Sequence, residues 1–345
     1  MKRWTQKPTG STWGDFGEDD QLGRVNLLTE EQVLKGVREV QLGKAFCLSL
    51  PLDLPGGMAL NPRRKPPHLS GTEKDGVPYM NFPMEKLDPS SIDVLSDDQV
   101  LLSLQYSTQW DALAHIGAYF DVDGNGAEKK VYYNGYEAGK DIVGPDDDHG
   151  EDGCCGGHSM GARKLGIENF AVKGMQGRGV LVDFTRRFGR EHQLIGYEEL
   201  MTVMKEDSVT VEAGDMLVLR TGFAEVILEM QGKPDINVLH QSCSVLDGAD
   251  ERLLNWVTES KITAICADNY AVEAYPARER EGRKSLLPLH HHCLFKLGLP
   301  LAELWYLKDL ADCLHGLGRN RFLLTAPPLR LPGAVGSPVT PVATV

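Results

Sequence analysis

The stretch DMLVLRTG, Asp215–Gly222, has the form of a buried β-strand that ends in polar and small residues. Three other short apolar runs share this form: VLLSLQY at 100–106, GVLVDF at 179–184 and ITAICADN at 262–269. Segments with helical patterns lie between and after them: YEELMTVMKE at 197–206, ADERLLNWVTES at 249–260 and PLAELWYLKDLADCL at 300–314. This mixture predicts an α/β fold in which the ends of strands carry polar residues.

The segment before these strands contains one clear helix start. TEEQVLKGVREV, residues 29–40, begins with Thr29 as N-cap and has Gln32 three residues later, which is the spacing of a capping box. The helix would have an apolar stripe made by Val33, Val37 and Val40. Residues 1–28, which are rich in Trp, Gly and Asp, predict an irregular N-terminal arm laid on the surface.

Two other segments are predicted to be irregular. Residues 51–90 hold many Pro, Gly and polar residues, which indicates a long loop that could cover a site. The tail at 326–345 is punctuated by proline and cannot be helical. The chain contains no internal repeat and no linker that clearly divides it, so residues 1–345 are predicted to form a single domain.

The composition is that of an ordinary globular protein. The chain has 345 residues, of which 41% are hydrophobic and 25% charged, so its core can be large without a metal or disulfide to hold the fold. The net charge is -13, and no basic cluster is rich enough to suggest nucleic-acid binding. We therefore expect no nucleic-acid partner; the expected partner is a small-molecule substrate.

The cysteine content and the apolar segments indicate the cellular compartment of the protein. Seven cysteines form no C-x-x-C pair, which favours free thiols in a reducing cytosol over a disulfide framework. The N-terminal stretch MKRWTQKPTGSTWGDFG has no apolar core of a signal peptide, and no run of about 18 apolar residues predicts a membrane span. We therefore expect a soluble cytoplasmic protein without a membrane partner.

The first candidate for chemistry is YSTQWDALAH, Tyr106–His115. In an extended strand Gln105, Gln109 and Asp111 would point to one side, because strand side chains alternate with a period of two, and His115 would follow closely. This arrangement is either a metal site in which amides have replaced stronger ligands or a structural polar patch.

The second candidate is LHHHCLFKLGLPLAELW at 289–305, in which His291 and Glu303 are twelve residues apart. An unbroken helix would separate them by about 18 Å. Gly298 and Pro300 should break that helix, so the two side chains could still converge on one metal.

Three further segments have two readings each. Asp268 and Asn269 end a strand in CADNYAVEAYP, where they either carry function or form a turn. In RTGF, 220–223, the glycine either admits a ligand close to the backbone or makes a turn. The acidic, glycine-rich loop at 145–161 either binds a cation or is a flexible, solvated insertion.

At this point the residues resemble a known family. QYSTQWDALAH is similar to the H-x-G-T-H-x-D-x-x-x-H signature of the cyclase family, the metal-dependent hydrolases that include bacterial kynurenine formamidase and isatin hydrolase. Further similar segments follow in order: GMQGRGVLVDF, GDMLVLRTG, ADNYAVE, HHCLFKLGLPLAE and LPGAVGSP. The resemblance spans roughly residues 13 to 342, and STQWD in place of GTHxD is typical of a longer subfamily.

The resemblance implies an α/β domain around a mixed, β-barrel-like sheet flanked by helices, assembled as a homodimer or homotetramer. It implies a zinc or manganese centre that hydrolyses amide or lactone bonds. By position, the implied metal ligands are Gln105, Gln109, Asp111, His291 and Glu303, and His115 is the implied acid/base. Because amide oxygens are harder ligands than imidazole, this set favours manganese over zinc.

The sequence thus predicts a metal-dependent hydrolase that opens a small cyclic amide or lactone, or cleaves an N-formyl or aryl amide. His115 would move the proton, and Trp110 and Phe223 would either form an aromatic wall for the substrate or pack in the core. Two alternatives stay open: a metal-free binding protein derived from such a hydrolase, and a lyase or dehydratase that uses the same histidine as base.

Overall fold

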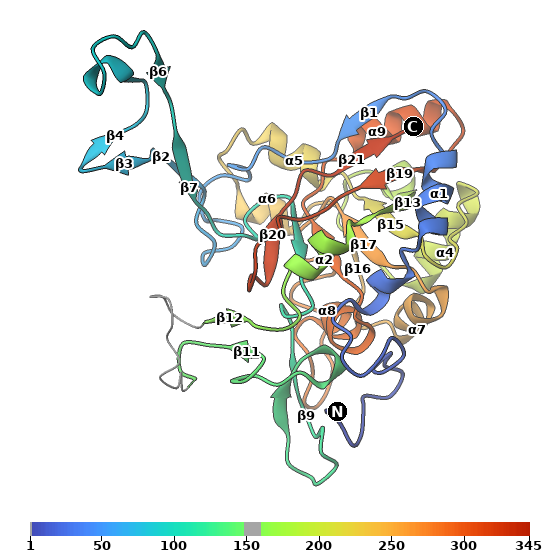
Figure 1. Ribbon diagram of the computed structural model, residues 1–345. Helices are drawn as coiled ribbons and strands as arrows, with labels where there is room; N and C mark the ends of the chain where they lie inside the picture. The colour runs from blue at the N-terminus through green and yellow to red at the C-terminus, as the bar shows by residue number, and fades with distance from the viewer. Residues whose placement is uncertain (1, 148–159) are drawn as a thin grey trace.

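The computed structural model describes residues 2–147 and 160–345. Its centre is a mixed nine-stranded sheet that curls part of the way into a barrel (Figure 1). The strands lie in the order β1 (Ala45–Cys47), β21 (Val342–Thr344), β19 (Arg321–Thr325), β13 (Gln176–Asp183), β15 (Met216–Arg220), β17 (Ala264–Ala267), β18 (Leu301–Glu303), β8 (Gln109–Asp111) and β20 (Gly336–Pro338). The predicted fold class is confirmed.

The middle of this sheet is parallel and buried on both faces. β13, β15, β17 and β18 run parallel to one another. Along β15, Met216 and Val218 enter one hydrophobic core, whereas Leu217 and Leu219 enter another. A strand covered on both faces has a continuous apolar sequence instead of an alternating one, and this explains the run DMLVLRTG.

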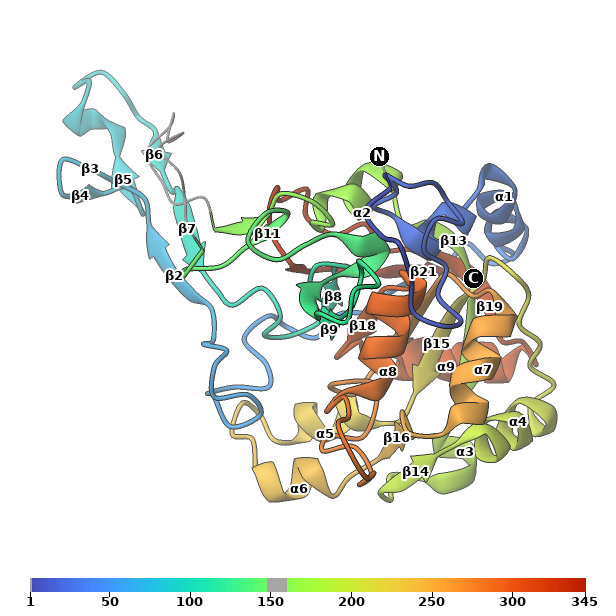
Figure 2. The same ribbon diagram turned by 90° about the horizontal axis from the view of Figure 1, so that it is seen from below.

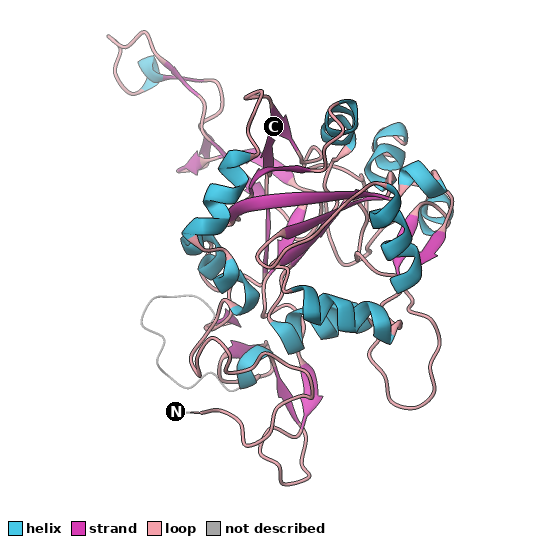
Figure 3. Ribbon diagram, turned by 90° about the vertical axis from the view of Figure 1, so that its right-hand side faces the viewer, coloured by secondary structure: helices cyan, strands magenta, loops and turns pink. Residues whose placement is uncertain are grey.

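Helices flank the central strands (Figure 3). α4 (Tyr197–Glu206) and α7 (Glu251–Ser260) pack in the core that Leu217 and Leu219 enter, and α9 (Lys308–Gly316) packs in the other core. The helices predicted at 197–206 and 249–260 are therefore confirmed.

Two of the predicted elements are wrong in part. The helix expected over 300–314 begins as β18, because Leu301–Glu303 is fully buried and pairs with β17, and only α9 is helical. The strand expected over 100–106 ends at Leu101, because β7 (Asp98–Leu101) pairs with β2 (His68–Gly71) away from the central sheet.

Helix α1 (Glu30–Arg38) begins after Thr29, as predicted, but its packing differs from the prediction. The Thr29 side chain makes no capping hydrogen bond, and the Gln32 amide donates to the Ala213 carbonyl at 3.0 Å instead. The predicted valine stripe is wrong, since Val37 is 48% exposed. Gly36 faces β13, where an added Cβ would lie 2.7 Å from the Gly177 carbonyl oxygen, so the close approach of helix and strand requires glycine.

The N-terminal segment is irregular as far as a short 3-10 helix at Gly23–Leu27, yet it is anchored to the body. Trp13 is fully buried and donates from Nε1 to the Phe295 carbonyl at 2.8 Å. Arg24 donates to the Val257 carbonyl at 2.7 Å. The segment therefore contributes to the core as well as to the surface.

Residues 68–101 form a two-stranded arm that projects from the body (Figures 1 and 2). The predicted loop over 51–90 is thus partly wrong: the arm contains β2, β7 and the short strands β3 (Glu73–Lys74), β4 (Val77–Pro78), β5 (Phe82–Pro83) and β6 (Val94–Leu95). Most of its apolar side chains are poorly covered, and Ile92 is 96% exposed, although Phe82 is buried. The assembly into two or four copies stays a prediction.

The remaining elements are short: β9 (Ala118–Phe120), β10 (Lys129–Val131), β11 (Ile142–Val143), β12 (Gly161–Ala162), β14 (Gln193–Ile195), β16 (Ser244–Leu246), α2 (Glu168–Lys173), α3 (Thr185–Phe188), α5 (Phe223–Glu229), α6 (Ile236–His240), α8 (Pro288–His290), the 3-10 turns Met84–Lys86 and Tyr133–Gly135, and a π-helix at His291–Leu297. The proline-rich tail carries strands and no helix. Most of the loop predicted at 145–161 lies outside the described residues. Within the described chain, no helix combines the length and apolarity that crossing a bilayer requires.

Trp110, one of the two aromatic residues considered for a substrate wall, lies in the core. It is fully buried, its ring meets that of Trp305 edge-on at 5.5 Å, and its Nε1 donates to the Ala326 carbonyl at 2.8 Å. Phe223 is also buried, at the start of α5, with its ring 5.4 Å from that of Tyr270. Both therefore take the packing role.

We predict that Trp110→Phe lowers the free energy of unfolding by about 1–3 kcal/mol, because it removes the hydrogen bond to Ala326 and leaves a void beside Trp305. Urea denaturation measures this change. The exposed Tyr119→Phe is the control and should stay within about 0.5 kcal/mol of the wild type. Unchanged stability in Trp110→Phe would contradict the packing role.

Candidate metal centre

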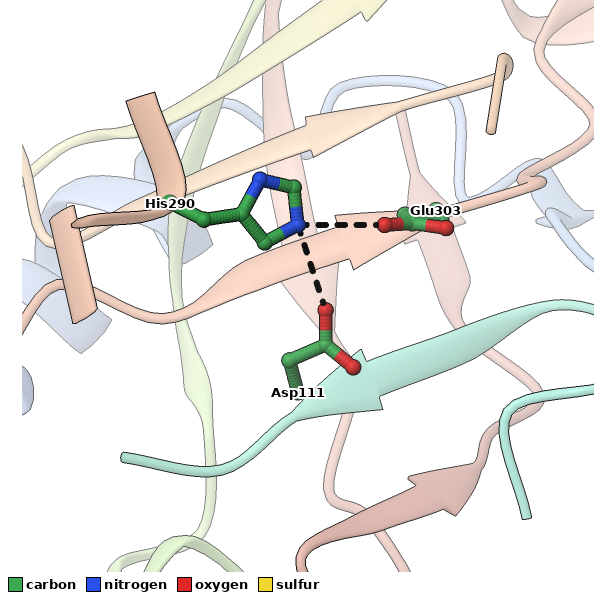
Figure 4. A group of neighbouring side chains, drawn as sticks. All are labelled: Asp111, His290 and Glu303. Atoms are coloured by element: carbon green, nitrogen blue, oxygen red, sulfur yellow. Dashed lines mark ion pairs between the residues drawn. The ribbon is translucent and has the colours of Figure 1, made fainter. Parts of the chain in front are cut away.

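Three ionisable side chains from separate elements converge at one point (Figure 4). Asp111 comes from β8, Glu303 from β18 and His290 from the end of α8. The His290 Nε2 atom lies 3.4 Å from Glu303 Oε1 and 3.8 Å from Asp111 Oδ2. One ligand atom from each residue lies within 4.8 Å of the others, and all three residues are buried. Buried charges of this kind are usually paired or bound to a metal.

The pairing of β8 with β18 brings the two carboxylates together. The strands are antiparallel, with Glu303 opposite Gln109 and Ala302 opposite Trp110. Because side chains alternate along a strand, Gln109 and Asp111 share the face of Glu303, and Trp110 points to the opposite face and into the core. Sequence periodicity therefore identified the face correctly for Gln109 and Asp111.

Gln105 does not belong to this strand, because β8 spans only Gln109–Asp111 and a turn precedes it. The Gln105 side chain lies instead beside His115, with its Nε2 atom 3.4 Å from the His115 Nδ1 atom. His115 follows β8 and places its Nε2 atom 3.9 Å from Asp111 Oδ1. Gln105 is thus a neighbour of the candidate acid/base and not a member of the three-residue cluster.

The histidine in the cluster is His290, and not His291 as expected from the sequence. The His291 ring packs 4.9 Å from the Phe295 ring, and the residue lines a separate hollow with His292 and Lys296. The physical reason is the π-helix that begins at His291. Its hydrogen bonds span one residue more than those of an α-helix, so the histidine that faces Glu303 precedes it by thirteen residues and not by twelve.

Glu273 fixes the orientation of His290, and no motif in the sequence singles it out. Its Oε1 atom lies 2.8 Å from His290 Nδ1, and its carboxylate also accepts from the backbone N–H groups of His290 and Leu289 at 2.9 and 2.8 Å. With Nδ1–H donating to Glu273, the Nε2 atom is directed at Asp111 and Glu303. The available signal was an acidic residue in a buried apolar segment just after a strand end.

Asp268 and Asn269 have structural roles at the strand ends. Asp268 accepts from the Thr221 N–H and hydroxyl at 2.8 and 2.7 Å and from the Gly222 N–H at 2.7 Å. Burial, with the nearby charge of Glu225, raises the pKa of Asp268 to about 7 despite these bonds. Asn269 donates to the Ser244 carbonyl at 3.0 Å. These contacts join the ends of neighbouring strands, and neither residue belongs to the three-residue cluster.

The cluster has polar atoms that nothing in the described chain satisfies. Both carboxylate oxygens of Asp111 and both amide atoms of Gln109 are buried without a hydrogen-bond partner among the described residues. Such orphaned groups are rare and cost roughly 1–3 kcal/mol each, more when charged. A divalent cation fits this set, since it would take lone pairs from Asp111, Glu303, His290 Nε2 and the Gln109 amide oxygen.

Burial and neighbouring charges shift the pKa values of all three residues in the cluster. Burial raises the pKa of Asp111, and the charge of Glu303 adds to this effect although His115 opposes it. Burial opposes ionisation of Glu303 as well, but its ion pair with His290 and the charge of Arg64 lower its pKa overall. Burial would lower the pKa of His290, yet Glu273 and Glu303 outweigh it and raise this pKa to about 10.

A cavity of about 580 Å³ opens directly over the cluster. His115, His290 and Glu303 contribute to its lining. Much of the rest is apolar or aromatic, with contributions from Leu60, Tyr106, Ile116, Tyr270, Leu286 and Leu287. This combination of apolar walls and a few convergent polar groups is typical of a small-molecule site. Neither Trp110 nor Phe223 lines the cavity.

Comparison with known proteins agrees with this fold. A family model described as "Putative cyclase" matches residues 47–274. The crystal structure of a novel cyclase has 30% sequence identity to this chain, with 97% of both chains covered and a TM-score of 0.73. No curated protein matches the chain.

Two isatin hydrolases share the fold at low identity. Isatin hydrolase A from Labrenzia aggregata, bound to benzyl benzoate, is 12% identical, with 87% of this chain and 93% of that chain covered and a TM-score of 0.54. An isatin hydrolase bound to the product analogue thioisatinate is 13% identical, with 92% and 99% covered and a TM-score of 0.54. At these identities the likeness concerns the fold alone.

We predict that Glu273→Gln weakens binding of a divalent cation by about 10- to 100-fold, because the amide no longer holds His290 through a charged hydrogen bond. Titration calorimetry with Mn²⁺ measures the dissociation constant. Glu259→Gln, an exposed change on α7, is the matched control and should leave it unchanged. Equal Mn²⁺ affinity in wild type and Glu273→Gln would show that Glu273 does not support a metal site.

Proposed function

The chain belongs to the cyclase family, and from this premise we propose that it is a metal-dependent hydrolase. Its substrate would be a small cyclic amide or lactone, or an N-formyl or aryl amide. The observation that carries the proposal is the buried cluster of Asp111, His290 and Glu303, in which both Asp111 oxygens lack a hydrogen-bond partner among the described residues and of which His290 and Glu303 line a large cavity.

The cluster would hold one divalent cation through two carboxylates, the His290 Nε2 atom and the Gln109 amide oxygen. When bound, such a cation supplies Lewis acidity, which polarises a carbonyl group and makes water more acidic. Three of these four donors are oxygen atoms, whereas zinc sites favour nitrogen and sulfur. The donor set therefore favours manganese over zinc.

His115 is the proposed acid/base. It lines the cavity, its side chain is 21% exposed, and its Nε2 atom lies 3.9 Å from the Asp111 carboxylate. It would take a proton from the attacking water and return it to the leaving nitrogen or oxygen. His290, the other histidine in the lining, donates to Glu273 through Nδ1, and its Nε2 atom would bind the cation, so neither nitrogen would be available to move a proton.

The metal content of protein purified without chelator or nickel is the first test. Elemental mass spectrometry should find close to one manganese or zinc per chain. Hydrolysis of a panel of lactones, cyclic amides and N-formyl amides in ¹⁸O-water should place one labelled oxygen in each product carboxylate or formate. Protein that takes up neither ion would support a metal-free binding protein, and turnover without label would support a lyase or dehydratase.

We predict that His115→Ala retains its metal and loses about 10²- to 10⁴-fold in kcat, because this range is typical of a general acid/base. Steady-state kinetics and elemental analysis of the same preparation measure both effects. Asp111→Ala, in contrast, should lose metal together with activity. Wild-type turnover by His115→Ala would remove this histidine from the mechanism.

We predict that Gln109→His shifts the metal preference toward zinc, since an imidazole nitrogen replaces an amide oxygen on the face that carries Asp111. Competition between Mn²⁺ and Zn²⁺, read by elemental analysis, measures the shift. Gln99→His, on the exposed strand β7, is the control. An unchanged Mn²⁺/Zn²⁺ ratio would show that Gln109 does not face the ion.

A further inference from the structure

Arg64 is a half-buried cation in the wall of the cavity above the metal cluster. It lies at the foot of the projecting arm, and its Nη1 group donates to the Gln105 carbonyl at 2.7 Å. A guanidinium has five N–H groups. Among the described residues this is the only hydrogen bond that the side chain makes, and no carboxylate forms an ion pair with it within 4.0 Å. One N–H group of the guanidinium is thus used in the described structure, and its other N–H groups can bind a ligand.

The charge of Arg64 reaches the reaction centre. The guanidinium lines the same cavity as Glu303, and its positive charge helps to lower the pKa of Glu303 and opposes the raised pKa of Asp111. Those carboxylates are occupied by His290 and by the cation that the proposed function assigns to them. A divalent cation would neutralise both, and the positive charge of Arg64 would then have no counter-ion in the chain.

The rest of the cavity strengthens this excess of positive charge. Arg63, which also lines the cavity, has no ion-pair partner within the described part of the chain. Glu303 is the only carboxylate among the described lining residues. The whole chain has a net charge of -13, so this cavity, lined by two arginines and one carboxylate, is a local excess of positive charge that would attract an anion.

We infer that the cavity selects substrates that carry a carboxylate beside the lactone or amide bond, and that Arg64 binds this carboxylate. A planar guanidinium matches a carboxylate through two parallel hydrogen bonds, which gives orientation as well as affinity. The apolar walls formed by Leu60, Ile116, Leu286 and Leu287 would take the hydrocarbon part of the same molecule. This inference rests on the proposed hydrolase function and names its substrate class.

Two matched pairs of probes test the inference. The first is 5-oxotetrahydrofuran-2-carboxylate against its neutral carboxamide, and the second is 2-formamidobenzoate against 2-formamidobenzamide. The two members of each pair have nearly the same size and differ in one charge, with an NH₂ group in place of one carboxylate oxygen. Dissociation constants are measured by titration calorimetry with and without Mn²⁺, and KM and kcat are measured for any probe that is turned over.

The wild type should bind the carboxylate of at least one pair about 10- to 100-fold more tightly than the carboxamide. Arg64→Gln should reduce this preference to about twofold, and Arg64→Lys, which keeps the charge, should restore part of it. Arg38→Gln, an exposed change of the same charge on α1, should leave the preference intact. If only the metal bound the carboxylate, Arg64→Gln would not weaken its binding. The titration without Mn²⁺ measures the affinity that Arg64 provides in the absence of the metal.

Three results would overturn the inference: equal affinity for both members of each pair, no saturable binding of either carboxylate, or an equal loss for both members in Arg64→Gln. The last result would mean that Arg64 acts on the bond that is cleaved and not on a separate carboxylate. Hydrolysis without any charge preference would leave the proposed function standing. A charge preference that depends on Arg64, without hydrolysis in Mn²⁺ or Zn²⁺, would support carboxylate binding by Arg64 and contradict the proposed hydrolase function.

Discussion

Two carboxylates, Asp111 and Glu303, are buried beside each other across β8 and β18, and the architecture of the site follows from their repulsion. A third carboxylate, Glu273, lies just behind them on the far side of the His290 ring. Burying three acids around one imidazole costs several kcal/mol for each charge unless positive charge is supplied. Without a bound ion, a His290 imidazolium offsets part of this charge; a divalent cation would replace the Nε2 proton, bind the neutral ring and offset more of it. The cluster is therefore intelligible as a cation site, whereas a purely structural polar patch would leave Asp111 buried without a hydrogen-bond partner among the described residues.

The sequence was sufficient for those features that local patterns determine. Continuous apolar runs marked the parallel strands because both of their faces are buried, and a period of two placed Gln109 and Asp111 on one face of β8. Features that depend on tertiary pairing could not be predicted from the sequence. Leu301–Glu303 is equally compatible with a helix or a strand, and only its pairing with β17 decides between them. Where an apolar stripe was expected, the Gln32 amide bonds the Ala213 carbonyl, and Gly36 faces β13 because helix and strand approach too closely there for a larger side chain.

The choice among three consecutive histidines shows the same limit within the site. Counting back from Glu303 selected His291, but the π-helix after His290 changes which ring faces the sheet. A single-residue change of helical register is invisible to periodicity, since 289–297 is apolar and histidine-rich throughout. Glu273 was missed for a related reason. Its role depends on accepting the N–H groups at the start of α8, and no spacing in the sequence links residues 273 and 290.

Residues 57–65, which lead into the arm, connect the cavity wall to the segment directly before the metal site. Arg64 donates to the Gln105 carbonyl, Lys65 N–H donates to the Ser103 hydroxyl at 2.8 Å, and the Tyr106 hydroxyl donates to the Gly57 carbonyl at 2.8 Å. All three bonds end on residues 103–106, directly before β8. A two-stranded ribbon has little stability of its own in water, so these bonds, and not the arm, hold the cavity wall in place. These bonds fix the wall that carries Arg64 relative to Asp111, which lies five residues beyond Tyr106. The charge that would orient a substrate therefore keeps a constant position relative to the groups that would act on it.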